Sequence, residues 1–132
     1  MQETKKDKSK RSNAKMKMRV NMTAKDVFNA NTSSVKVAFN LPIKLAGFAV
    51  TEGKDKETGE TKEIGYVKDT EGNIYGFISS VAIESLENLH DFVTETYGTE
   101  ENPDYYPEGD ITIKFIKGKS KGGREFTNIV IV

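Results

Sequence analysis

Apolar residues gather in three short stretches between residues 44 and 79, and runs of charged and turn-forming residues separate them. Short apolar runs bounded by glycine-containing turns are typical of antiparallel β-strands. The pattern therefore predicts a three-stranded meander with strands at 44–51, 62–68 and 73–79. Each predicted strand contains one interior glycine, which favours a bulge, sharp coiling or the close approach of another backbone; the three are Gly47, Gly65 and Gly76.

The period of the pattern changes after residue 79. Apolar side chains then recur every three or four residues with acidic residues between them, and this spacing describes one amphipathic helix. The apolar positions are Ile83, Leu86, Leu89, Val93 and Tyr97. Ser79 or Ser80 can cap the start of the helix, and Gly98 can end it.

Two further strands, at 110–117 and 124–132, complete the predicted elements. A polar loop at 99–109 precedes them, and a turn rich in glycine and lysine at 118–123 joins them. The order is then β-β-β-α-β-β, with one helix between strands three and four. This order is typical of the Greek-key barrel that binds oligonucleotides or oligosaccharides, the OB fold. We therefore expect a mainly β protein with a five-stranded OB-fold barrel.

The N-terminal part of the chain has a different character. Residues 1–19 contain almost no apolar side chains and predict a disordered basic arm. Since 132 residues suffice for one domain, residues 20–132 are expected to form a single OB-fold domain. Within it, residues 23–30 predict one or two helical turns with Thr23 as the N-cap, and residues 35–39 predict a short strand or an extended lead-in.

The 20 basic and 20 acidic residues give a formal net charge of zero, but they are unevenly distributed. Residues 1–19 carry eight basic and two acidic residues, a net charge of +6, so the remaining 113 residues carry −6. Residues 95–110 contain six acidic residues and no basic one, whereas residues 114–124 contain five basic residues and no acidic one. Such a chain can present a positive surface to phosphate while staying neutral in sum.

The composition excludes several kinds of chemistry. The chain has no cysteine, which removes thiol catalysis and cysteine-ligated metal sites and agrees with a reducing compartment. The single histidine, His90, has no partners for a catalytic triad or a zinc site. No apolar run approaches the roughly 20 residues that span a bilayer, and no secretion signal is present. We expect a cytoplasmic protein that is not an enzyme and that uses no cofactor, metal, membrane or small-molecule substrate.

Basic and aromatic side chains interleave on the predicted strands. In an OB fold, nucleic acid binds to the face of strands two and three, to the loop between strands one and two and to the loop between strands four and five. Aromatic rings there can stack on bases, while lysine and arginine contact the phosphates. The expected binding residues are Tyr66, Lys68, Tyr75 and Phe77 on strands two and three, and Lys114, Lys117, Lys119, Lys121 and Arg124 on the last hairpin.

The alternation of side chains divides strand three between two faces. Ile74 and Ile78 share one face, and Tyr75 and Phe77 share the other. Isoleucine is the more typical core residue, so Tyr75 and Phe77 are assigned to the binding groove. Phe115 and Phe126 of the last two strands are also expected in the core.

Two stretches of the sequence are similar to a known family. They are Glu71-Gly-Asn-Ile-Tyr-Gly-Phe-Ile-Ser-Ser80, which runs into the acidic helix, and Ile111-Thr-Ile-Lys-Phe-Ile-Lys-Gly-Lys-Ser-Lys-Gly-Gly-Arg-Glu-Phe126. Together with Phe28-Asn29-Ala30 and Leu41-Pro42, and in the same order, they resemble the single-stranded DNA-binding proteins of small protein-primed Bacillus phages.

The resemblance implies an OB-fold protein that coats and protects single strands displaced during DNA replication, in the cytoplasm of a bacterial host. A strand-three tyrosine that stacks on bases in this family matches Tyr75. Family members can carry another tyrosine near the end of the first strand, where this chain has Thr51 and Glu52. The expected partner is single-stranded DNA, with replication proteins as further candidates.

We therefore expect a sequence-nonspecific single-stranded DNA-binding protein. Two alternatives stay open from the sequence: an OB-like module that binds a protein partner through its groove, and an RNA-binding protein of the cold-shock type. Salt-sensitive binding to poly-dT separates the first alternative from DNA binding, and competition between DNA and RNA separates the second.

Overall fold

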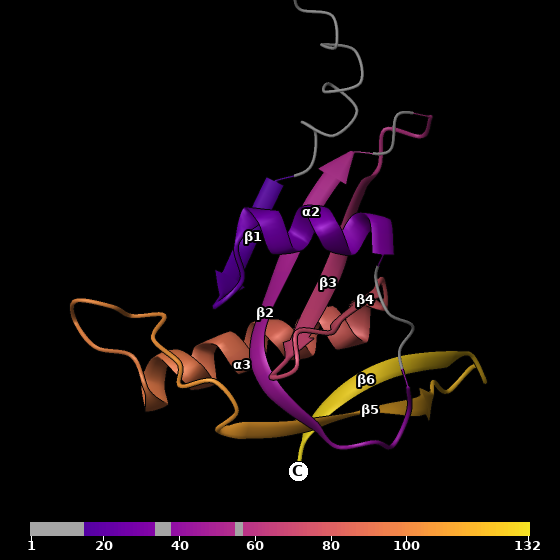
Figure 1. Cartoon of the computed structure of the whole chain (residues 1–132). Coiled ribbons are helices and arrows are strands. Elements are labelled where there is room, and N and C mark those ends of the chain that lie inside the picture. Colours follow the sequence, from indigo (N-terminus) through magenta and orange to yellow (C-terminus); the bar gives the residue numbers. More distant parts are fainter. Residues whose placement is uncertain (1–14, 34–37, 55–56) are drawn as a thin grey trace, which may run out of the picture.

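The computed structural model in Figure 1 describes residues 15–33, 38–54 and 57–132. Within these residues, six antiparallel strands in one sheet and two helices form a mainly β structure, which confirms the predicted class. The elements in chain order are β1 (Lys15–Val20), α2 (Ala24–Ser33), β2 (Ile43–Lys54), β3 (Thr61–Asp69), β4 (Ile74–Phe77), α3 (Ser80–Thr96), β5 (Ile111–Lys119) and β6 (Glu125–Ile131).

The sheet is built around β2, a strand long enough to have different neighbours at its two ends (Figure 1). On one side, β3 pairs with β2 from Leu45 to Lys54. On the other side, β5 pairs with Ile43–Leu45, and β1 takes its place further along, where Val20 lies opposite Phe48. The strand order is β4-β3-β2-β5-β6, with β1 added to β2.

Gly47 allows β2 to change its neighbour. The pairing of β2 with β3 shifts its register between Leu45 and Gly47, which marks a bulge and bends the strand. A Cβ atom on residue 47 would lie 2.6 Å from the carbonyl oxygen of Val20, much closer than a side chain can approach a backbone atom. Glycine is therefore required here, and both the bulge and the close approach predicted for this position are confirmed.

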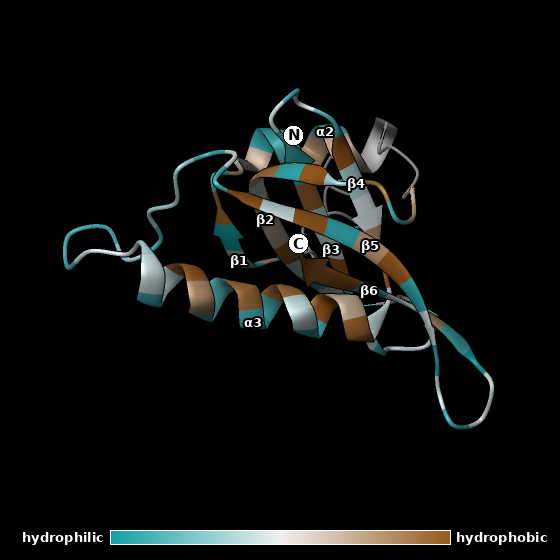
Figure 2. Ribbon diagram, turned by 90° about the horizontal axis from the view of Figure 1, so that it is seen from below, coloured by the Kyte–Doolittle hydropathy of each residue, from teal (hydrophilic) through white to brown (hydrophobic). Residues whose placement is uncertain are grey.

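The main core lies between α3 and one face of the sheet, which we call the inner face (Figure 2). The buried stripe of α3 packs there with Phe48, Val67 and Phe115 of the strands. The helix begins after Ser79, whose hydroxyl oxygen accepts a hydrogen bond from the N–H of Ala82 at 3.4 Å. This hydroxyl also donates to a carbonyl oxygen of β6, and so fixes the start of α3 against that strand.

A second, smaller core covers the opposite face of the sheet, which we call the outer face. The helix α2 crosses β2 and β3 on this side (Figure 1), and its Val27 and Ala30 are buried against Ala49 and Tyr66. Thr23 caps the helix, because its hydroxyl accepts from the N–H of Asp26 while its own N–H donates to the Asp26 carboxylate, each at 3.0 Å. The sheet is therefore covered on both faces.

The strand β1 is a correction to the sequence analysis. The disordered arm predicted for residues 1–19 is wrong for residues 15–19, which belong to β1, and residues 1–14 lie outside the described part of the chain. Met16 and Met18 are partly buried and alternate with exposed basic residues. The strand thus has the expected period of two, but the high charge of the segment conceals it in the sequence.

The other elements agree with the predictions to within a few residues, and the helix predicted at 23–30 extends to Ser33. Within residues 15–33, 38–54 and 57–132, the sheet has six strands rather than the five expected. Among the described strands, β4 and β6 lie at the two ends of the order and do not pair with each other. Of the lead-in predicted at 35–39, residues 35–37 lie outside the described part, and Phe39 forms an isolated bridge with Phe115.

The acidic loop between α3 and β5 is held to the sheet by a buried tyrosine. The hydroxyl of Tyr106 donates to the carbonyl oxygen of Leu45 and accepts from the N–H of Ile111, both at 2.8 Å. At the start of the loop, Tyr97 donates to the carboxylate of Asp110, and this hydrogen bond together with burial raises the pKa of Tyr97 to about 12. The loop is therefore attached at both of its ends.

Replacing Tyr106→Phe should lower the free energy of unfolding by about 1–3 kcal/mol, because it removes the acceptor of the buried Ile111 N–H and one donor to the Leu45 carbonyl oxygen, which keeps the Gly109 N–H at 2.7 Å. Urea unfolding followed by circular dichroism measures this change. Tyr105→Phe is the matched control. The ring of Tyr105 is exposed, so this variant should hardly change the free energy of unfolding. Equal stability of the two variants would contradict the role given to Tyr106.

Candidate nucleic-acid interface

The expected binding residues of β3 lie beneath α2. Tyr66 is only 2% exposed, and its burial raises the pKa of its hydroxyl. Lys68 pairs with Asp26 of α2 at 3.3 Å. The pKa of Asp26 is lowered by the hydrogen bond from the Thr23 N–H and, against the effect of burial, by the charge of Lys68. The assignment of Tyr66 to a base-stacking surface is therefore wrong for this structure, because the helix occupies the space above its ring.

The side chains of β4 face the opposite way from the sequence prediction. Phe77 is 8% exposed and lies in the main core, with its ring centroid 5.4 Å from that of Phe115. Ile78, which was expected in the core, is 78% exposed, and Ile74 packs against the second core. The assignment of Phe77 to the groove is therefore corrected. Because both faces of the sheet are covered, both sides of β4 carry apolar side chains, and their apolar character alone does not show which side belongs to the inner face.

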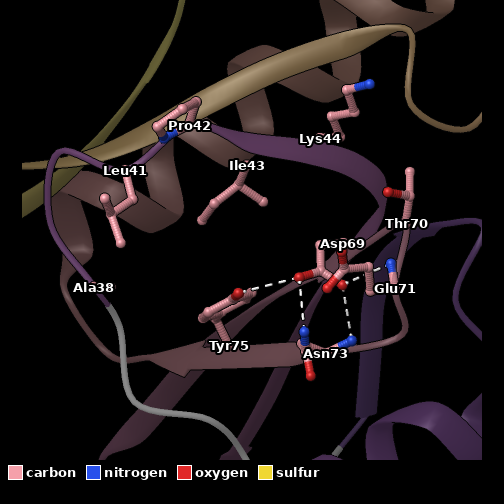
Figure 3. A pocket seen from close by; sticks show the side chains of 10 residues that line it. All are labelled: Ala38, Leu41, Pro42, Ile43, Lys44, Asp69, Thr70, Glu71, Asn73 and Tyr75. Atoms are coloured by element: carbon pink, nitrogen blue, oxygen red, sulfur yellow. Dashed lines mark hydrogen bonds between the residues drawn. The ribbon is translucent and has the colours of Figure 1, made fainter.

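Tyr75 lies at the rim of the main core. Its side chain is half-buried, and its ring centroid is 6.0 Å from that of Phe115, which is fully buried as predicted. The Tyr75 ring also lines a hollow of about 300 Å³ between the β3–β4 turn and residues 38–44 (Figure 3). Leu41 and Ile43 lie across this hollow from the ring. Tyr75 thus joins the core on one side and an open, partly apolar surface on the other.

Asp69 organises the turn that carries Tyr75 (Figure 3). Its carboxylate accepts hydrogen bonds from the backbone N–H groups of Glu71 and Asn73 at 2.9 and 2.8 Å. It also accepts from the side-chain amide of Asn73 and the hydroxyl of Tyr75, each at 3.1 Å. Burial by itself would raise the pKa of Asp69, but these hydrogen bonds outweigh it and lower the pKa below its ordinary value. Burial and the neighbouring Asp69 carboxylate raise the pKa of Tyr75.

Phe39 extends this surface towards the β5–β6 hairpin. It bridges to Phe115, and the N–H of Asn40 donates to the carbonyl oxygen of Phe115 at 2.8 Å. The ammonium nitrogen of Lys117 lies 5.0 Å from the centroid of the half-buried Phe39 ring, a cation–π contact. Phe115 therefore has Tyr75 on one side and Phe39 on another. The sequence analysis did not identify Phe39, because no local pattern predicts a bridge to Phe115, which is distant in the chain.

The tip of the hairpin is exposed and basic. Lys117 and Lys119 follow Phe115 on the same side of β5, and Lys121 and Arg124 lie in the turn. The turn is closed by a hydrogen bond from the Ser120 N–H to the Arg124 carbonyl oxygen at 2.9 Å. Lys114 is half-buried on the other side of β5. Some of the expected binding residues thus lie near Phe39. Together with Phe39 they form what we call the aromatic–basic surface, which consists of Phe39, Tyr75, Lys117, Lys119, Lys121 and Arg124.

The acidic loop at 99–110 lies away from the aromatic–basic surface. The loop leads into the first residue of β5, and the basic tip follows the last one (Figure 1). Nine residues of β-strand rise about 30 Å at roughly 3.3 Å each, so the two charged regions are separated by nearly the length of β5. The acidic loop therefore lies far from the basic tip, and none of its residues lines the hollow beside Tyr75.

The described part of the chain holds neither a metal-binding cluster nor a membrane-spanning helix. No group of three or more acidic or histidine side chains there is placed to hold a metal ion. In the same residues, neither helix is long and apolar enough to cross a membrane. His90 contacts only the carboxylate of Asp104, at 2.8 Å, among the charged groups that the structure describes.

Comparison of the chain with protein-family models, with curated proteins and with solved structures gives no match.

Asp69→Asn should lower the free energy of unfolding at pH 7 by about 1–3 kcal/mol, because the amide replaces a charged acceptor of four hydrogen bonds. The folded pKa of Asp69 lies below the unfolded value of about 3.9, so the carboxylate stabilises the fold above that pH and loses its effect as the pH falls through the folded pKa. The difference in the free energy of unfolding between wild type and Asp69→Asn should therefore become smaller below pH 4. Urea unfolding at pH 7, 4 and 3 tests this, with exposed Asp91→Asn as the control. A difference that is constant with pH would rule the explanation out.

Proposed function

We propose that the protein binds single-stranded DNA without sequence preference through the aromatic–basic surface. The observation that carries the proposal is that two half-buried aromatic rings, Phe39 and Tyr75, flank Phe115 at the base of an exposed basic hairpin. Rings of this kind stack on any base, and lysine and arginine side chains follow the phosphates. Both contacts are tolerant of sequence.

The topology supports an OB-type barrel formed by β2 to β6. Its first strand, β2, pairs with both β3 and β5, and α3 connects β4 to β5. In this proposal, β1 and α2 are additions to the barrel. The strands β4 and β6 are not paired to each other, and residues 38–42 lie beside β5 and line the hollow next to Tyr75 of β4.

The proposed path of the DNA differs from the one expected for an OB fold. The outer face of β3 and β4 is occupied by α2, with Tyr66 buried and Lys68 paired to Asp26. The DNA is therefore placed beside residues 38–42, over the hollow next to Tyr75 and along the hairpin. Neither Tyr66 nor Lys68 has to be uncovered for this binding.

The biological role that we propose is the coating and protection of single strands during DNA replication, with replication proteins as further partners. This role rests on the resemblance of residues 71–80 and 111–126 to phage single-stranded DNA-binding proteins. It places the protein in the cytoplasm of a bacterial host. The proposed activity is binding alone and includes no catalytic step.

The first test is a titration of fluorescein-labelled poly-dT at several salt concentrations. We expect salt-sensitive binding, and the triple variant Lys117→Ala, Lys119→Ala, Lys121→Ala should reduce the slope of log K against log salt by about 2, since each phosphate contact on a single strand contributes about 0.7. The matched control changes three exposed lysines elsewhere, Lys15→Ala, Lys25→Ala and Lys54→Ala, with the same loss of charge. An equal effect of the two triple variants would place the DNA elsewhere.

The same titration separates the alternatives. Equal competition by poly-U would favour an RNA-binding protein, and an absence of poly-dT binding at low salt would overturn the proposal and favour a protein-binding module.

The second test separates stacking from stability at Tyr75. Tyr75→Phe keeps the ring and removes the hydroxyl that donates to Asp69, so it should bind poly-dT nearly as well as wild type although it is less stable. Tyr75→Leu removes the ring and should bind about 5- to 150-fold more weakly, corresponding to the 1–3 kcal/mol of one stacked base. Circular dichroism checks that both variants are folded at the assay temperature. Equal affinities of the two folded variants would show that Tyr75 does not stack on DNA.

A further inference from the structure

A second surface, remote from the hairpin tip, lies between α3 and β6. A groove of about 280 Å³ is lined there by Ser85, Asn88, Leu89, Phe92, Ile129 and Ile131. Phe92 is 44% exposed and Ile131 is 51% exposed, and the neighbouring Val132 is exposed as well. An apolar patch of several large side chains on one surface is typical of an interaction site.

The edge of β6 that faces away from β5 is open beside this groove. The N–H of Val132 donates to Thr112 of the β5 strand, so by antiparallel alternation the backbone groups of Ile129 and Ile131 point away from β5. The N–H of Ile129 already bonds the side chain of Asn128, at 2.8 Å. In the described part of the chain, the N–H and carbonyl of Ile131 have no hydrogen-bond partner on this side. They form a short template for another strand.

Acidic residues border the groove on its helix side. Three exposed acidic residues form a stripe along α3, next to the side of the helix that carries the groove-lining Asn88 and Phe92. They are Glu84, Asp91 and Glu95. Within the described residues, none of the three acids has an ion-pair partner. From Glu84 to Glu95 the stripe runs roughly 16 Å along the helix axis.

We propose that this groove binds an extended segment of a partner protein, which adds to the edge of β6 as a strand and carries apolar side chains flanked by basic ones. Two apolar side chains on one face of the segment fill the groove beside Phe92. Basic side chains two positions before and after them, on the same face, reach the acidic border. The outer positions of such a seven-residue segment are about 20 Å apart, which suits the length of the acidic stripe.

Charge argues against a second copy of this chain as the occupant. A two-fold pairing of β6 with β6 of another copy brings the same surfaces together, so the acidic stripes of the two α3 helices would approach each other. Like charges that meet across an interface are unfavourable. A basic partner segment brings the opposite charge instead.

The test uses a fluorescein-labelled peptide of seven residues with lysine at positions 1 and 7, valine at positions 3 and 5, and threonine at the even positions. Fluorescence anisotropy with the full chain should show binding at sub-millimolar concentration. The same peptide with glutamate in place of lysine should bind at least tenfold more weakly. Equal binding of the two peptides, or no binding of the lysine peptide, would overturn the proposal.

Variants of β6 test the strand addition. Ile131→Pro removes an N–H that points away from β5 and should weaken lysine-peptide binding at least fivefold more than Ile131→Ala, which keeps the N–H. Equal affinity of these two variants would exclude backbone pairing at this edge.

Variants of α3 test the charged border. Glu84→Lys with Asp91→Lys should also weaken binding of the lysine peptide at least fivefold, whereas Glu100→Lys with Glu101→Lys in the exposed acidic loop makes the same charge change away from the groove and should not. Equal effects of the two pairs would reduce the binding to non-specific charge attraction and overturn the proposal.

Two controls separate this site from the other possibilities. The affinity for poly-dT should be unchanged in Ile131→Pro and should be the same in the two pairs of charge variants, so the outcome is independent of the proposed DNA binding. Sedimentation of the full chain should show that Phe92→Ser does not alter its oligomeric state. Self-association of the wild type that Phe92→Ser abolishes would identify a second copy as the occupant and overturn the choice of partner.

Discussion

The contact between the Val20 carbonyl and Gly47 is the constraint on which the rest of the fold depends. Because residue 47 has no Cβ atom, β1 can approach β2 at the point where β2 bends and leaves β5. One strand then joins both parts of the sheet, with β3 and β4 on one side and β5 and β6 on the other. The chain that follows β1 forms α2, which closes the outer face. The covering of that face thus depends indirectly on a single glycine.

Covering both faces of the sheet decides which surface is left for binding. The outer face of β3 is aromatic and basic, as a nucleic-acid surface would be, but its Tyr66 and Lys68 serve to dock α2. The inner face holds the Tyr75, Phe77 and Phe115 rings around the main core. As far as the described residues show, only the rim of this aromatic cluster, where Tyr75 and Phe39 are partly exposed, remains open beside the basic hairpin. This is why we place the DNA at the rim and not on the face of the sheet.

The chain has no net charge, but the strand β5 keeps its acidic and basic regions apart on the surface. The strand separates an acidic loop at its start from a basic turn at its end, so opposite charges in the sequence do not neutralise each other in space. The acidic stripe of α3 lies beside a third region, the open edge of β6. Nucleic acid and a basic protein segment would accordingly be drawn to different parts of the surface.

Local patterns in the sequence determined the elements. The spacing of Ile83 to Tyr97 with the cap at Ser79 predicted α3, and the glycine-containing apolar runs predicted the meander and the hairpin, because these signals arise between neighbours in the chain. The basic hairpin of the candidate site was predictable for the same reason. The sequence could not determine which side of β4 faces the core, because helices cover both faces of the sheet and both sides carry apolar residues. The strand character of β1 and the bridge from Phe39 to Phe115 likewise depend on partners far away in the chain, so only the tertiary structure decided them.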